Sequence, residues 1–345
     1  MSKKTLTRPT LDILVVGGGT FGTALSSILA DMKRRIKLWA RRPEQVEEIN
    51  SQHTNSRYLP DIELPVNLRA TSDLEGAIRQ APVILVVVPS KSFRQVARQI
   101  GNSVQGDQVL VHATKGIEIE TFKRMSEILR EETCALKIGA LSGPNLAREI
   151  MAGQPAGALV ASRYNEVSEA IQPLFSGSRM RIYSGRDVIG TEIAGSFKNI
   201  IAVAAGVADG MGLGDNAKSL LTTRGLSEMA RFGVALGADV FTFGGLAGIG
   251  DLMATCASPL SRNHQVGERL AKGEKLTEIL DKMTQVAEGV PTTKAVHNQA
   301  KEMGLDLPIV RAVYGLLYED WSSAKALTEL MAIPVARELA ALQYR

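Results

Sequence analysis

Residues 11–32 read LDILVVGGGTFGTALSSILADM, and they are the most informative stretch for the fold of the first part of the chain. A short apolar run leads into the pattern G-x-G-x-x-G at residues 17–22, and a helical pattern follows up to Met32. Gly17 allows a tight turn, Gly19 lets the backbone approach a pyrophosphate, and Gly22 lets strand and helix pack closely. The helix N-terminus then faces the phosphates with free N–H groups. An ordinary structural turn is the alternative, but a strand before, a helix after and a second strand beyond favour a dinucleotide site.

The end of the second strand bears on which dinucleotide binds. A protein specific for NAD usually places Asp or Glu there, on the ribose 2′-hydroxyl. Here Trp39 and Ala40 lead into Arg41 and Arg42 instead. Arginines suit a 2′-phosphate, so NADP(H) is favoured and NAD(H) stays open. The alternative is that both are solvated loop arginines.

Short apolar runs alternate with helical segments from Leu11 to about Ser184, which is typical of a parallel sheet with helices on both faces. The run Val83–Val88 has no polar residue and predicts a central strand that is covered on both faces. The expected strands are 11–16, 36–40, 83–88, 108–113, 137–141, 156–161 and 180–183. The fold class is therefore α/β, with an N-terminal Rossmann-type doubly wound sheet.

Beyond about Asp187 the alternation stops, and segments rich in Ala, Leu and Gly follow. Helical spacing is visible at 193–208, 222–236, 265–271 and 292–303. The polar turn cluster at residues 184–187 predicts a domain boundary. We expect an NAD(P)-binding domain at 1–187 and an all-helical C-terminal domain at 188–345.

Composition indicates a folded cytoplasmic protein. Apolar residues make up 45% and charged residues 22% of the 345, and 40 Lys plus Arg against 36 Asp plus Glu give a charge of only +4. That balance argues against a nucleic-acid-binding surface. Two cysteines far apart, Cys134 and Cys256, fit a reducing compartment, and we expect both to be buried. No run of about 18 apolar residues is evident, so no membrane-spanning helix is expected.

Four predicted strand ends carry glycine, proline, lysine or small polar residues. They are the glycine pattern, Pro89-Ser90, Thr114-Lys115-Gly116 and residues 142–145, which read SGPN. Ligands of doubly wound sheets bind beyond the carboxyl ends of the strands. The four ends together predict one ligand-binding rim, with Lys115 as a cation beside the nicotinamide end.

Several strings resemble the bacterial NAD(P)-dependent glycerol-3-phosphate dehydrogenases, and they occur in that family's order. The strings are the fingerprint with Thr20-Phe21, ATKG at 113–116, SGPNLA at 142–147, Lys198-Asn199, GIGDL at 248–252, SRN at 261–263 and Glu288-Gly289. Together they span roughly Leu14 to Leu317. Nothing after about Ser322 can be matched.

The resemblance implies reversible reduction of dihydroxyacetone phosphate to sn-glycerol 3-phosphate, which supplies glycerophospholipid synthesis. It also implies a homodimer and a helical domain for substrate binding and dimerisation. Lys198 would be the catalytic proton donor or acceptor. Substrate would contact Lys115, Gly143, Asn145, Lys198, Asp251, Ser261, Arg262 and Asn263. Besides the glycines, cofactor would contact Thr20, Phe21, Arg41, Lys115, Ala147, Arg262, Val286 and Glu288.

Lys198 has support from its own surroundings in the sequence. On a helix its neighbours one and two turns away are Ala194, Gly195, Ala202 and Ala205, a stripe of small residues. Such a stripe permits close approach of another segment, and partial burial would lower the pKa of the amine toward the operating range. The alternative is a lysine whose stem packs on the helix while its ammonium stays in water.

The other substrate candidates also have ordinary structural alternatives. Ser261 could be only a helix N-cap, Arg262 only a solvated charge, and Asp251 only the residue of a local Asx-turn. If Ser261-Arg262-Asn263 opens a helix, its free N–H groups and one guanidinium can hold a phosphate.

Two other functions remain open at this point. One is another two-domain NAD(P)-dependent hydroxy-acid dehydrogenase of the 6-phosphogluconate-like type, which would not predict SRN beside Lys198-Asn199. The other is a redox-sensing regulator, which should carry a nucleic-acid-binding module. The four histidines show no metal-ligand spacing, and we expect no metal.

Overall fold

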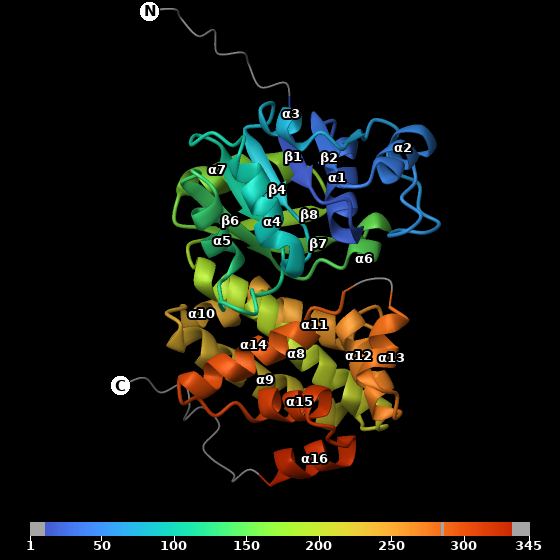
Figure 1. Ribbon diagram of the computed structural model, residues 1–345, viewed down its shortest axis with the longest axis vertical. Coiled ribbons are helices and arrows are strands. Elements are labelled where there is room, and N and C mark those ends of the chain that lie inside the picture. The colour runs from blue at the N-terminus through green and yellow to red at the C-terminus, as the bar shows by residue number, and fades with distance from the viewer. Residues whose placement is uncertain (1–10, 284–285, 333–345) are drawn as a thin grey trace, which may run out of the picture. The chain divides into compact units, whose positions relative to one another are not determined.

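A computed structural model describes residues 11–283 and 286–332 of the chain (Figure 1). The chain divides into two compact units. The first holds the residues up to Thr114 together with Ser126–Leu141 and Asn145–Arg186. The second holds Lys115–Met125, Ser142–Pro144 and the chain from Asp187 onward. Two short segments that follow strands of the first unit thus belong to the second.

The first unit is built on one sheet of eight strands within the described residues. The strand order is β3-β2-β1-β4-β5-β6-β7-β8, and the pairings β1–β2, β2–β3, β1–β4, β4–β5, β5–β6 and β7–β8 are parallel. The first six positions have the doubly wound dinucleotide-binding order, which confirms the predicted fold class. The bounds are β1 Ile13–Val16, β2 Ile36–Trp39, β3 Ala70–Thr71, β4 Val83–Val86, β5 Val109–His112, β6 Lys137–Ser142, β7 Ala156–Ser162 and β8 Met180–Gly185.

Burial explains why the apolar runs became central strands. All four residues of β4 are buried, and so are those of β1 and β5 on either side of it. Since strand side chains point alternately to opposite faces, such strands must be covered on both faces. The predicted central strand is confirmed, although it ends at Val86, two residues before the apolar run does. The two-residue strand β3 was not predicted because it is too short to show an alternating pattern.

Amphipathic helices supply that cover. Helix α4 buries Phe93, Val96, Ala97 and Ile100, which recur at the spacing of one helix face. The described helices of this unit, including α5 directly before β6, are α1 Thr20–Asp31, α2 Pro43–Gln52, α3 Leu74–Ile78, α4 Ser90–Gly101, α5 Met125–Glu132, α6 Ala147–Met151 and α7 Asn165–Phe175.

The second unit is helical throughout its described elements, as predicted (Figure 1). Its core helix is α8, Val188–Gly210, which begins where Asp187 accepts the Gly190 N–H at 2.8 Å. The predicted helix begins later, at Ile193, because Gly190, Thr191 and Glu192 interrupt the apolar pattern after Val188 and Ile189. The elements that pack against α8 are α9 Asp215–Ala235, α10 Val240–Phe243, η1 Leu246–Gly250, α11 Asp251–Ala257, α12 Arg262–Ala271, α14 Gly289–Glu302 and α15 Pro308–Tyr318. Helix α13, Leu276–Asp281, packs against α12, and α16, Ser323–Met331, packs against α15.

Helices α8 and α12 approach each other so closely that only glycine fits between them. A Cβ atom at Gly206 of α8 would lie 1.9 Å from the His264 carbonyl oxygen. A Cβ atom at Gly267 of α12 would lie 1.9 Å from the Val203 carbonyl oxygen. The two backbones are therefore in direct contact along this seam.

Two helical stretches in the described residues are long and apolar enough to cross a membrane by length and composition alone, although no run of about 18 apolar residues is evident in the sequence. Val188–Gly210 is one, and 94% of its apolar window is buried inside the protein, so its apolarity is accounted for by its place in the core. Val240–Ala257 is the other, and it is interrupted by non-helical backbone at Gly248. Burial in the core therefore accounts for the first stretch, whereas only 39% of the apolar window of the second is buried.

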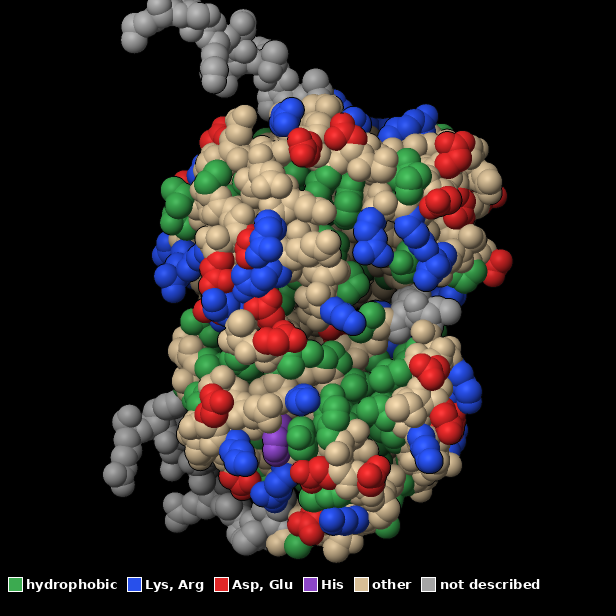
Figure 2. Space-filling model, in the orientation of Figure 1, with side chains coloured by type: hydrophobic (Ala, Val, Ile, Leu, Met, Phe, Trp, Pro, Cys, Tyr) green, Lys and Arg blue, Asp and Glu red, His purple; other side chains and the backbone are tan. Residues whose placement is uncertain are grey.

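The surface carries charges of both signs, and the two cysteines differ in exposure. On the face drawn in Figure 2, basic and acidic side chains are intermingled, in keeping with the small net charge. Cys256 is buried as predicted. The prediction for Cys134 is wrong, because it lies exposed in the turn between α5 and β6.

Candidate active site

The glycine loop, residues Gly17–Gly22, joins β1 to α1. Gly17 has φ +129°, and a Cβ atom there would lie 2.2 Å from the Val87 carbonyl oxygen. A Cβ atom at Gly22 would lie 1.9 Å from the Gly17 carbonyl oxygen. Gly19 has open space where its Cβ atom would be, at the N-cap of α1. The loop is thus closely packed at Gly17 and Gly22 and open at Gly19, where a pyrophosphate would reach the helix N-terminus.

Two buried amides support this loop, and the sequence analysis missed both. Gln45 Nε2 donates to the Gly18 carbonyl oxygen at 2.5 Å, and Asn55 Nδ2 donates to the same oxygen at 3.1 Å. Asn55 Nδ2 also donates to Thr23 Oγ1 at 2.8 Å, which fixes the loop to the first turn of α1. Their distance in sequence from the loop left no local signal by which to find them.

The remaining predicted cofactor residues of the first unit lie around the loop and the end of β2. Thr20 Oγ1 donates to the Tyr58 carbonyl oxygen at 3.3 Å, and Phe21 is half-buried. Arg41 is exposed just beyond β2. Arg42 forms the N-cap of α2, and its guanidinium lies 5.7 Å from the centre of the Tyr58 ring.

The SGPN string is divided between the units. Asn145 is buried and precedes α6, whose first residue is Ala147. Helix α6 packs against α1, so Ala147 belongs to the neighbourhood of the nucleotide helix. Gly143, with φ +145°, belongs to the second unit with Lys115.

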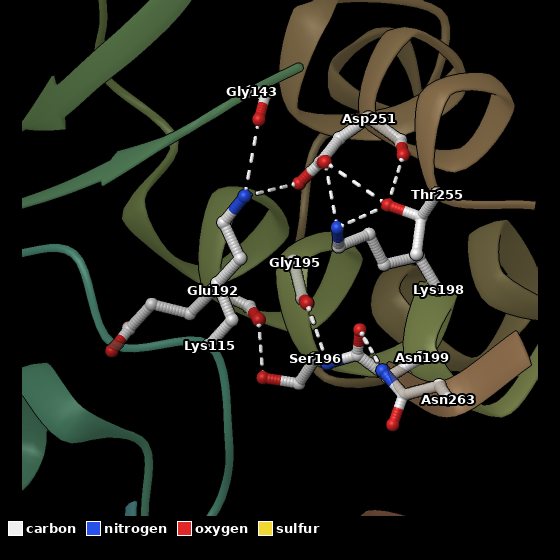
Figure 3. A network of polar contacts seen from close by, with 10 residues as sticks. All are labelled: Lys115, Gly143, Glu192, Gly195, Ser196, Lys198, Asn199, Asp251, Thr255 and Asn263. Carbon is white, nitrogen blue, oxygen red and sulfur yellow. Dashed lines mark hydrogen bonds and ion pairs between the residues drawn. The ribbon is translucent and has the colours of Figure 1, made fainter. Parts of the chain in front are cut away.

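The lysine–aspartate centre, which comprises Lys115, Gly143, Lys198, Asp251 and Thr255, lies in the second unit (Figure 3). Lys115 Nζ donates to Asp251 Oδ2 at 2.7 Å and to the Gly143 carbonyl oxygen at 3.0 Å. Lys198 Nζ donates to Asp251 Oδ1 at 2.6 Å. Asp251 is 2% exposed and holds one lysine on each carboxylate oxygen. The structure brings four predicted site residues together here, drawn from segments far apart in the sequence.

Burial makes Lys198 an unusual lysine. Its side chain is 6% exposed, so the alternative of an ammonium in water is excluded. Burial is the largest cause that lowers the pKa of Lys198 to about 8; the Asp251 carboxylate opposes this and the charge of Lys115 adds to it. An amine with that pKa can both give and accept a proton near neutral pH.

Thr255 is a member of the centre that the sequence analysis missed. Its hydroxyl accepts a hydrogen bond from Lys198 Nζ and donates to the Asp251 carbonyl oxygen at 2.7 Å. It lies four residues after Asp251 on α11, and this spacing was the available signal. The Asx-turn alternative for Asp251 does not hold, since its carboxylate accepts from the two lysines.

A chain of amides connects α8, α12 and α14. Asn263 Nδ2 donates to Asn199 Oδ1 at 2.9 Å, and Asn263 Oδ1 accepts the Gly289 N–H at 2.8 Å. Both ends of the Asn263 amide therefore hold structure together. Ser261 is the N-cap of α12, as the structural alternative stated, and accepts the His264 N–H at 3.4 Å.

Arg262 and the loop before α14 form the outer part of the site. Arg262 is the first residue of α12 and is exposed, and its guanidinium donates to the Val286 carbonyl oxygen at 2.9 Å. Val286 is 45% exposed, and Glu288 is the N-cap of α14. Within the described ranges, no group of three or more His, Cys, Asp or Glu side chains is placed to hold a metal ion.

Comparisons with known proteins identify the family of the chain. Residues 12–168 match the family model described as NAD-dependent glycerol-3-phosphate dehydrogenase N-terminus, and residues 187–328 match that of the C-terminus. Similar curated relatives are named glycerol-3-phosphate dehydrogenase [NAD(P)+]. One, from Listeria innocua, is 44% identical and another, from Bacillus anthracis, 45%; each match spans 322 residues, 92% of this chain and 95% of the relative.

A solved structure shows the same fold over nearly the whole chain. The crystal structure of glycerol-3-phosphate dehydrogenase from Coxiella burnetii matches with a TM-score of 0.89 and 34% identity, covering 93% of this chain and 98% of that one. The family is NAD(P)-dependent and has an NAD-binding domain. The matches therefore favour this family over the 6-phosphogluconate-like dehydrogenase and the redox-sensing regulator that the sequence left open. The chain belongs to the NAD-dependent glycerol-3-phosphate dehydrogenase family.

Proposed function

We propose that this chain is an NAD(P)-dependent glycerol-3-phosphate dehydrogenase that reversibly reduces dihydroxyacetone phosphate to sn-glycerol 3-phosphate. Family membership supports the reaction, and the observation that carries the chemistry is the buried Lys198, bonded to Asp251 beside Lys115. Reduction of a ketone needs a hydride at carbon and a proton at oxygen. The glycine loop would hold the cofactor that carries the hydride, and Lys198 would supply the proton.

The glycine loop fits the dinucleotide. When bound, the nicotinamide cofactor supplies or takes up the hydride. The open space at Gly19 and the N–H groups at the start of α1 suit a pyrophosphate. Thr20, Phe21, Arg41 and Ala147 extend this surface within the first unit.

Lys198 handles the proton. As an ammonium group it has three N–H bonds, of which one goes to Asp251 and one to Thr255, so a third remains for the substrate oxygen. In reduction Nζ donates its proton to the carbonyl oxygen. In oxidation the neutral amine accepts the hydroxyl proton, and Asp251 stabilises the resulting ammonium.

Cations and amides orient the phosphorylated substrate. Arg262 at the start of α12 offers a guanidinium for two charge-assisted bonds to phosphate oxygens. Lys115 adds a second positive charge, and Gly143, Asn145, Ser261 and Asn263 complete the proposed substrate set. Because Asn263 already bonds at both ends of its amide, we assign it to holding α12 in place as much as to touching substrate.

The deciding experiment compares the parent chain with Lys198→Met by following reduced-nicotinamide absorbance with dihydroxyacetone phosphate. Methionine keeps the length of the buried side chain, so fold and cofactor binding should persist while kcat falls by about 10² to 10⁴. Turnover within a few-fold of the parent would remove Lys198 from the mechanism. If the parent oxidised glycerol as efficiently as glycerol 3-phosphate, the proposed phosphate-binding role of Arg262 would be refuted.

Several wider properties belong to the same proposal. We assign cofactor binding mainly to residues 1–187, which also contribute Lys115, Gly143 and Asn145 to the substrate set, and the rest of substrate binding and dimerisation to 188–345. We further propose a cytoplasmic homodimer that supplies glycerophospholipid synthesis. Sedimentation of a monomer at micromolar concentration would refute the dimer.

A further inference from the structure

The segment Lys115–Met125, here named the lysine arm, leaves the strand β5 and packs with the helical unit. It begins with Lys115, which bonds to Asp251, and near its end it carries Arg124. Residues 117 and 124 face each other across an antiparallel bridge, and the Glu118 N–H donates to the Lys123 carbonyl oxygen at 3.0 Å. The arm is therefore a hairpin whose two ends are joined by backbone pairing.

Apolar contacts hold the middle of the arm. Ile117 is 3% exposed and belongs to the hydrophobic core of the helical unit. Phe122 packs edge-on against Phe232 of α9, with ring centres 5.8 Å apart at 88°. Phe122 has φ +56°, which bulky residues adopt only where surrounding packing fixes the backbone. The middle of the arm is therefore packed into the core of the helical unit.

A buried ion pair holds its far end. Arg124 Nη1 lies 2.8 Å from Glu192 Oε2, and the two side chains are 16% and 3% exposed. Glu192 belongs to α8, six residues before Lys198, and Figure 3 shows its side chain pointing away from Asp251. A carboxylate this deeply buried needs a partner, and apolar residues of similar size would give at least as much stability. A buried ion pair is therefore weak evidence for a gain in stability, and its fixed geometry is the property on which the proposal below is built.

We propose that Arg124 and Glu192 are a positioning pair that fixes the lysine arm on α8 and thereby holds the Lys115 ammonium against Asp251. Neither residue touches the reacting atoms. The inference rests on the proposed roles of Lys115 and Lys198. It adds to them a pair of residues that sets the position of Lys115 relative to Lys198.

The pair has a consequence for proton transfer. The charge of Lys115 is one cause that lowers the pKa of Lys198, after burial. A loosened arm would let Lys115 move away, and the pKa of Lys198 would rise. Oxidation of glycerol 3-phosphate, which needs neutral Lys198, would then require a higher pH.

A double-mutant cycle tests the proposal with Arg124→Met, Glu192→Gln and the double variant. Each single variant should raise the KM for glycerol 3-phosphate about tenfold and move the pH profile of its oxidation upward. The loss of kcat/KM in the double variant should be clearly smaller than the product of the two single losses. Arg124→Lys should restore part of the loss, because it keeps the charge. Arg311→Met is the matched control, since Arg311 pairs with the exposed Asp306 in the same unit.

Circular dichroism and thermal melts separate positioning from folding. Variants that melt earlier but, while folded, keep the parent KM and pH profile would show a purely structural pair and overturn the proposal. Losses that multiply independently in the double variant would also overturn it. If Arg124→Met does not fold, Arg124→Lys carries the same test of KM and pH profile. If Lys198 does not carry the proton, Lys198→Met will show it by keeping its turnover. The KM values in the double-mutant cycle of Arg124 and Glu192 do not depend on that result.

Discussion

The glycine loop and the lysine–aspartate centre reach their geometry in different ways. The loop is six consecutive residues, and its shape follows from where a Cβ atom would collide with the backbone. The centre joins Lys115, Lys198 and Asp251 across sequence separations of 136 and 53 residues. A local motif of the first kind can be recognised in one window of sequence, whereas a site of the second kind exists only after the chain has folded. The two regions should accordingly respond differently to small substitutions.

The largest effect is expected at Asp251, where one carboxylate serves both lysines. Asp251→Asn keeps the shape but leaves two ammonium groups facing each other in a buried place. We expect kcat for reduction to fall by about 10² to 10⁴ and stability to fall by about 3 to 5 kcal/mol. Steady-state kinetics and denaturant titration measure the two losses. The control Asp306→Asn removes an exposed partner of Arg311 and should leave kcat unchanged; equal losses in both variants would contradict a special role for the centre.

The glycine loop offers a sharper contrast between two neighbouring positions. Gly22→Ala forces a Cβ atom against the Gly17 carbonyl oxygen, so we expect a loss of about 1 to 3 kcal/mol or more in stability and no measurable cofactor binding. Gly19→Ala meets nothing within 4 Å and should melt like the parent, while its affinity for the dinucleotide falls. Calorimetry and fluorescence titration distinguish these outcomes. Identical melting temperatures for the two variants would show that the loop is not packed as described.

The pH dependence of the two reaction directions probes the centre without substitution. Since the pKa of Lys198 is lowered to about 8, the amine is mostly protonated below that pH and mostly neutral above it. The oxidation rate should rise about tenfold per pH unit up to about pH 8 and then level off, and the reduction rate should level off below it and fall above it. Parallel profiles in both directions would mean that another group carries the proton. Residual activity of Lys198→Met should lack the inflection.

The smallest effect is expected at the end of β2, where exposure leaves Arg41 free to meet solvent or ligand. Arg41→Asp should lower the ratio of kcat/KM for NADPH over NADH about tenfold, because one charge-assisted hydrogen bond is lost and repulsion is gained. Arg181→Asp, an exposed arginine on β8, serves as control. An unchanged ratio in Arg41→Asp would make this arginine a bystander.

The sequence predicted what local patterns determine. Strands such as Val83–Val86 and helices such as α1 were predictable because burial on both faces and helical spacing leave traces in short windows. The position of Lys198 beside a stripe of small residues was also predictable. The close approach that such a stripe permits is present, since a Cβ atom at Gly195 would lie 2.8 Å from Ser142 Oγ. The amides Gln45 and Asn55, the hydroxyl of Thr255 and the Arg124–Glu192 pair were not visible, since each gains its meaning from a partner brought near by folding. The boundary at residue 187 likewise could not reveal that the lysine arm joins the second unit.

The glycine seam between α8 and α12 sets a fixed span inside the helical unit. Lys198 and Asn199 stand on one of these helices, and Arg262 begins the other, with the Asn199–Asn263 bond as a cross-brace. Two backbones in direct contact have no side chains between them that could change rotamer and let the helices slide. The conformational entropy of placing Lys198 at the right distance from Arg262 is therefore lost once, during folding, and not again in every catalytic cycle.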